Sequence, residues 1–80
     1  MPPRLPQVSG SQLTRLLESL GYTHVRQRGS HARYSLSTAV GTHNITVPMH
    51  RVIAKGTLND ILNKVSLWTG IRKNDLIERL

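Results

Sequence analysis

The Gly29-Ser30 pair lies between two segments of alternating polar and apolar residues, and this arrangement constrains the fold more than any other part of the chain. The two segments run over residues 22–28 and 31–36. Alternation with a period of two is typical of strands that bury one face. Gly supplies the positive φ required at the first central position of a type II′ turn. The sequence therefore predicts an antiparallel hairpin with a two-residue loop.

A loop of two residues sets the register of this hairpin, and the register decides which side chains share a face. One face is then polar, with Arg28 opposite His31, Arg26 opposite Arg33, and His24 opposite Ser35. The other face is predicted to join the core, with Val25 opposite Tyr34, Gln27 opposite Ala32, and Leu36 beyond.

A helix is predicted before the hairpin. Ser9 and Gln12 have the spacing of a capping box, and four leucines follow at the intervals of an amphipathic helix: Leu13, Leu16, Leu17 and Leu20. Gly21 is expected to end this helix. Residues 1–8 contain three prolines and are predicted to form a flexible arm without a function, which leaves residues 9–80 as one domain.

A loop over residues 37–42 and a third strand over 43–47 are predicted after the hairpin, with Pro48 ending the strand because it lacks an N–H. Residues 49–55 form a connection to a second helix, which we expect to begin at the cap Thr57, with Asp60 at the capping-box position, and to run to Gly70. A short helix over 73–80 follows, with Asp75 in its first turn.

The order is α-β-β-β-α plus a short C-terminal helix, and this order predicts an α+β fold. The helices are expected to pack on one face of a three-stranded antiparallel sheet, while the other face stays exposed to solvent. The exposed face is predicted to carry the polar row of the hairpin: His24, Arg26, Arg28, His31 and Arg33.

Positive charge is concentrated on the hairpin and on the segment after it. The chain has 11 Lys and Arg against 4 Asp and Glu, a formal charge of +7, and no acidic residue lies between Ser19 and Asn59. This distribution favours a polyanionic partner, although a basic surface that only aids solubility is the alternative. The chain lacks cysteine, the apolar segment of a secretory signal and any segment long enough to span a membrane, so a cytoplasmic protein is predicted.

His31 is the residue whose position best suits catalysis, because it lies at the turn among cationic neighbours. An imidazole there can act as a general acid or base, and Arg28 and Arg33 can hold phosphate oxygens. The alternative is an exposed turn histidine without a role. The other three histidines are weaker candidates, and His50 is the strongest of them because it lies beside Arg51 after Pro48.

Other kinds of site receive little support from the sequence. The four histidines lack the i, i+4 spacing of a helical zinc site, and neither cysteine nor carboxylate lies among them, so no metal site is predicted. Ser30 lacks the context of a serine nucleophile.

The segments GYTHVRQRGSHARYSL, ITVPMH and KGTLNDIL resemble the HicA-type toxins, also called the YcfA-like family, which are small mRNA interferases of toxin–antitoxin pairs. The resemblance covers roughly residues 9–62. It implies a fold similar to the double-stranded-RNA-binding domain, metal-independent cleavage of mRNA without a cofactor, and a HicB-type antitoxin that blocks the active surface.

The resemblance also implies roles for residues. The family's catalytic histidine corresponds to His31, and Gly29 and Ser30 correspond to its supporting neighbours. Together with the charge pattern, it points to six residues as contacts to RNA: Arg26, Arg28, Arg33, His50, Arg51 and Lys55. Two alternatives stay open: a non-catalytic RNA-binding module of the same fold, and a protein that binds a protein partner or assists DNA binding.

Overall fold

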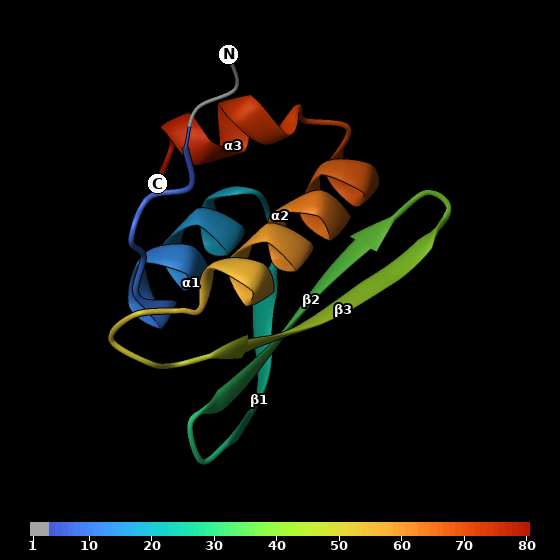
Figure 1. The fold of residues 1–80 in the computed structure, drawn as a ribbon. Coiled ribbons are helices and arrows are strands. Elements are labelled where there is room, and N and C mark those ends of the chain that lie inside the picture. Colours follow the sequence, from blue (N-terminus) through green and yellow to red (C-terminus); the bar gives the residue numbers. More distant parts are fainter. Residues whose placement is uncertain (1–3) are drawn as a thin grey trace.

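A computed structural model describes residues 4–80 and contains three helices and three strands (Figure 1). In chain order these are α1 (Gly10–Ser19), β1 (Thr23–Arg28), β2 (His31–Thr38), β3 (Gly41–Pro48), α2 (Lys55–Thr69) and α3 (Lys73–Glu78). The strands form one antiparallel sheet in the order β1-β2-β3. The predicted α+β fold and element order are confirmed.

The helices lie on one side of the sheet, with α3 farthest from the strands (Figure 1). Alternation along β2 and β3 directs one set of side chains toward the helices and leaves the other set exposed. The core residues that the two strands contribute are Ala32, Tyr34, Ile45 and Val47. Those of α1 and α2 are Leu13, Leu16, Leu17, Leu58, Ile61, Leu62 and Val65.

The first helix begins and ends as predicted. Ser9 accepts a hydrogen bond from the Gln12 backbone N–H at 3.1 Å, and the Gln12 side chain accepts one from the Ser9 N–H at 2.9 Å. This reciprocal capping box satisfies two N–H groups that a helix start leaves free. At the other end Gly21 has a φ of 101°, a left-handed conformation that suits glycine.

The second helix begins earlier than predicted. Its N-cap is Ala54, whose carbonyl accepts a hydrogen bond from the Leu58 N–H at 2.9 Å, so Thr57 lies inside the helix rather than at its cap. Its end at Gly70, with a φ of 74°, is as predicted.

The loop between β2 and β3 is also shorter than predicted, because both strands are longer. Only residues 39 and 40 separate them, instead of the expected 37–42. The Thr38 hydroxyl donates to the Gly41 carbonyl and accepts from the Val40 N–H, which stabilises a tight turn.

Residues 4–9 have no regular secondary structure, yet Val8 belongs to the packed core. Its side chain is buried, and its carbonyl accepts a hydrogen bond from the Ile53 N–H at 2.8 Å. The predicted arm over residues 1–8 thus includes a core residue at its end. Its first three residues lie outside the described part of the chain.

A bulge in β1 overturns part of the predicted register. The pairs Arg28–His31, Gln27–Ala32 and Arg26–Arg33 form as expected, but the register then shifts, so that His24 pairs with Tyr34 and Thr23 with Ser35. The bulge leaves Val25 without a partner, and its side chain is 53% exposed instead of buried. All of β1 is exposed, so packing does not force Val25 inward.

The same bulge moves His24 off the predicted polar row. Because directly paired residues share a face, His24 lies with Tyr34 on the side of the sheet that carries the core. Its ring meets the Tyr34 ring edge-on with centroids 5.3 Å apart, and its Nε2 lies 3.2 Å from Gln27 Oε1.

Gly10 allows α1 to lie directly against the end of β3. A Cβ atom at this position would be 2.6 Å from both the Met49 Cα and the Pro48 carbonyl oxygen. The Gly10 N–H donates to the His50 carbonyl at 2.9 Å, so the close approach includes a hydrogen bond. Only glycine fits this position without moving backbone atoms.

We expect Gly10→Ala to lower the free energy of unfolding by about 1–3 kcal/mol, the usual cost of forcing extra atoms into a packed site. Gly56→Ala is the matched control, since Gly56 also lies in a first helical turn but has open space around its Cβ position. The control should be neutral or slightly stabilising. Urea unfolding measures the free energy of unfolding of both variants. If Gly10→Ala is as stable as Gly56→Ala, the close approach does not constrain the fold.

His43 joins β3 to two distant parts of the chain. Its Nδ1 shares a hydrogen bond of 2.7 Å with the Tyr22 hydroxyl, and its ring stacks on Trp68 near the C-terminal end of α2, with centroids 5.2 Å apart. Burial, and then the positive charge of Lys64, lowers the pKa of His43. Burial also raises the pKa of Tyr22 to about 12.

This lowered pKa predicts that the fold weakens in mild acid. The unfolded chain takes up a proton on His43 near pH 6.5, while the folded chain does so only at lower pH. The contribution of His43 to the free energy of unfolding should therefore be complete above about pH 6.5. It should fall below that pH by at most about 1.4 kcal/mol per unit.

Urea unfolding between pH 5 and pH 8 measures this dependence. His43→Gln should flatten it, whereas His24→Gln, at an exposed position, should not. An unchanged pH dependence in His43→Gln would contradict the assignment.

Candidate active site

A shallow hollow of about 220 Å³ opens on the exposed face of the sheet. Five residues from all three strands line it: Arg26, Arg28, His31, Arg33 and Thr46. These five residues contribute three guanidinium groups and one imidazole, and none of them carries a carboxylate. The hollow is therefore suited to an anion.

Strand register explains why these residues meet. His31 is the first residue of β2 and pairs with Arg28 on β1, while Arg33 is two residues farther along the same face. Arg33 pairs with Arg26 on one side and with Thr46 on the other. The predicted gathering of three arginines around a histidine is thus confirmed as an arrangement in space.

Two hydrogen bonds stabilise the turn before His31. Gly29 has a φ of 58° and Ser30 a negative φ, the combination of a type II′ turn. The Gly29 carbonyl accepts from Gln27 Nε2 at 2.8 Å, and the Ser30 carbonyl accepts from the Met49 N–H at 2.6 Å. The carbonyls of both turn residues are thereby held, and that of Ser30, next to His31, is held by the segment that follows β3.

The arrangement supplies two chemical capabilities. Arginine side chains present planar donors that match phosphate oxygens and stabilise added negative charge. The imidazole of His31 is exposed and has the chemistry of a general acid or base. A phosphodiester held by the arginines would lie beside the imidazole.

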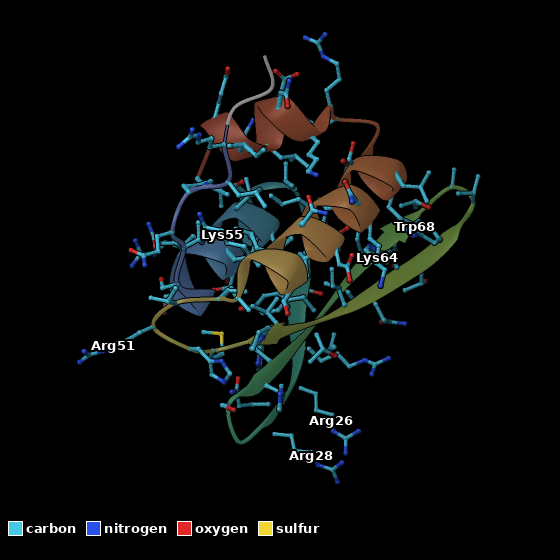
Figure 2. The ribbon with its side chains drawn as sticks, viewed as in Figure 1. Arg26, Arg28, Arg51, Lys55, Lys64 and Trp68 are labelled. Carbon is cyan, nitrogen blue, oxygen red and sulfur yellow. The ribbon has the colours of Figure 1, made fainter. Side chains whose placement is uncertain are left out.

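The other residues predicted to contact RNA do not line the hollow. His50, Arg51 and Lys55 are exposed on the connection after β3 and at the start of α2. Arg51 points outward from that connection, away from Arg26 and Arg28 (Figure 2). The predicted set therefore divides into a cluster at the hollow and three separate residues elsewhere.

Thr46 is the lining residue that the sequence prediction missed. Its position between Ile45 and Val47, which were expected to face the core, already placed it on the exposed face. The missing information was the register of β3 against β2, which brings Thr46 next to Arg33.

Two further properties concern residues 4–80 as a whole. No three His, Asp or Glu side chains within this range gather closely enough to form a metal site. In the same range, each helix is too short or too polar to cross a membrane.

The family model of the HicA toxin of bacterial toxin–antitoxin systems matches residues 10–67, well over half of the chain. The chain belongs to the HicA toxin family. The predicted resemblance is therefore confirmed, and the matched range includes every residue of the hollow. Family membership makes the chain a toxin of a toxin–antitoxin system, which pairs with an antitoxin. No curated protein and no solved structure matches the chain.

Removing an arginine from the hollow should weaken polyanion binding more than removing an arginine elsewhere on the surface. Arg28→Ala and Arg33→Ala should each reduce the slope of log binding constant against log salt by about 0.7, the value for one phosphate contact on a single strand. Arg15→Ala removes the same charge from the exposed face of α1 and should leave the slope nearly unchanged.

Titration of a single-stranded oligodeoxynucleotide at several salt concentrations measures these slopes. Equal effects of all three substitutions would show that net charge alone controls binding.

Proposed function

We propose that the protein is a metal-independent endoribonuclease that cuts mRNA and uses His31 as its catalytic residue. The observation that carries the proposal is the position of His31 at the edge of a hollow lined by three arginines. Membership in a toxin family supports a destructive activity on a cellular polymer, and the +7 charge suits RNA.

The reaction that suits these groups begins at the ribose. His31 accepts the proton of the 2′-hydroxyl as its oxygen bonds to the adjacent phosphorus. The bond from phosphorus to the 5′ oxygen breaks, and that oxygen leaves with the bonding electrons and takes a proton from water. The products are a 2′,3′-cyclic phosphate and a free 5′-hydroxyl, and the imidazolium then returns its proton to solvent.

The arginines contribute by stabilising charge. Attack on phosphorus adds negative charge to the non-bridging oxygens, and the guanidinium groups of Arg26, Arg28 and Arg33 can offset it. The turn hydrogen bonds to Gly29 and Ser30 fix the backbone from which His31 projects. We therefore assign these two residues a supporting role.

The proposed partner is a HicB-type antitoxin that covers the hollow. Such a protein would need acidic groups to meet the three arginines, and it would exclude RNA by occupying the same surface. The place of action follows from the substrate, since mRNA is present in the cytoplasm.

His31→Ala tests the function directly. We expect the purified wild-type chain to cut a single-stranded RNA in EDTA, and we expect His31→Ala to cut it at least about 100-fold more slowly, the lower end of general acid–base contributions. His24→Ala is the matched control, because His24 is exposed but lies on the opposite face of the hairpin. It should cut like the wild type.

Two results would contradict the proposal. Equal cleavage by wild type and His31→Ala would assign the cutting to another residue. Binding of RNA by both chains without cleavage by either would instead favour a non-catalytic RNA-binding module.

A further inference from the structure

A second concavity, of about 310 Å³, runs between the outer edge of β3 and α2, and we refer to it as the β3–α2 groove. From β3 it is lined by Asn44, Ile45 and Thr46. Thr46 also lines the arginine hollow, so the two concavities meet at this residue. A chain bound in the hollow could continue into the groove without leaving the surface.

The α2 side adds charged groups of both signs. Asp60 and Lys64 line the groove together with Thr57. Lys64 reaches from α2 toward the β2–β3 hairpin (Figure 2), and its charge contributes to the lowered pKa of His43 on β3. The groove therefore contains an anion and a cation along one wall.

The floor of the groove is apolar. Ile45 and Ile61 line it and are only 7% and 5% exposed, while Asn44, Thr46 and Asp60 around them are exposed. Two buried isoleucines among five polar lining residues give the groove a mixed character, and its volume is at the lower end of the usual range for small-molecule sites.

This composition differs from that of the arginine hollow in a way that selects another part of RNA. The hollow offers cations and suits a phosphate, whereas Asp60 would repel a phosphate placed beside it. A nucleobase has flat apolar faces and an edge that carries both donors and acceptors, and single-stranded RNA presents such bases to proteins. The groove matches the base rather than the phosphate.

We propose that the β3–α2 groove is a nucleoside subsite, which seats one base of a single-stranded RNA next to the phosphate in the hollow. Asn44 has an amide that can pair with the base edge, and Asp60 can accept a hydrogen bond from an exocyclic amine or a ribose hydroxyl. This subsite rests on RNA being the ligand, as in the proposed function, but it does not depend on cleavage.

The test measures binding to chains that carry His31→Ala, so that cleavage does not interfere. Fluorescence anisotropy gives the dissociation constants for four labelled RNA homopolymers of equal length. We expect the unmodified groove to prefer one or two bases, and Asn44→Ala to weaken the preferred binding about tenfold. Both Asn44→Ala and Asp60→Asn should flatten the preference among the four bases. Asn63→Ala, an exposed asparagine on α2 outside the groove, is the matched control and should change nothing.

The outcomes separate this proposal from the proposed function. If Asn44→Ala and Asp60→Asn bind all four RNAs like Asn63→Ala, or if the unmodified groove shows no base preference, the subsite is wrong even when the wild-type chain cuts RNA. If the wild-type chain does not cut RNA but these substitutions still flatten the preference, the subsite stands and the nuclease proposal falls. Thermal unfolding of each variant confirms that the chains compared are folded.

Discussion

The contact between Gly10 and the end of β3 is the constraint on which the rest of the structure depends. The missing side chain lets the first turn of α1 approach the Pro48 and Met49 backbone, and the Gly10 N–H binds the His50 carbonyl. The adjacent Met49 N–H donates to the Ser30 carbonyl, in the turn that precedes His31. One short segment after β3 thus connects a helix start, the end of the sheet and the turn beside the candidate catalytic residue.

The two faces of the sheet have different roles: one packs against the helices, and the other carries the candidate site. One face buries Ala32, Tyr34, Ile45 and Val47 against the helices and supplies most of the stability that the sheet contributes. The other face is free of packing demands, so it can carry a cluster of like charges that a core could not tolerate. His31 lies on this second face, beside the turn that the first face holds in place.

Much of the site could be predicted because its signals are local. A two-residue turn with Gly29 fixes the nearest strand pairs, and these pairs already bring Arg26, Arg28, His31 and Arg33 together. The bulge at Val25 could not be predicted, since the alternating pattern continues through it. It arises on an edge strand whose residues are all exposed, where little burial energy depends on the register.

Several other features could not be predicted from the sequence either. The start of α2 at Lys55 follows from backbone hydrogen bonding at Ala54, although Thr57 is the better capping residue by type. Thr46 and the β3–α2 groove depend on how β3 meets its neighbours. His43 looks like any other histidine in the sequence, and only the fold brings Tyr22 and Trp68 to it.

We propose that His31 activates a ribose hydroxyl beside a phosphate held by arginines. The most direct measurement compares two RNA oligonucleotides that differ only in one 2′-deoxy nucleotide on the 5′ side of the cut bond. We expect the all-ribose strand to be cut there to leave a 2′,3′-cyclic phosphate, while the substituted strand stays intact at that bond. Cleavage of both strands at the same rate would contradict it.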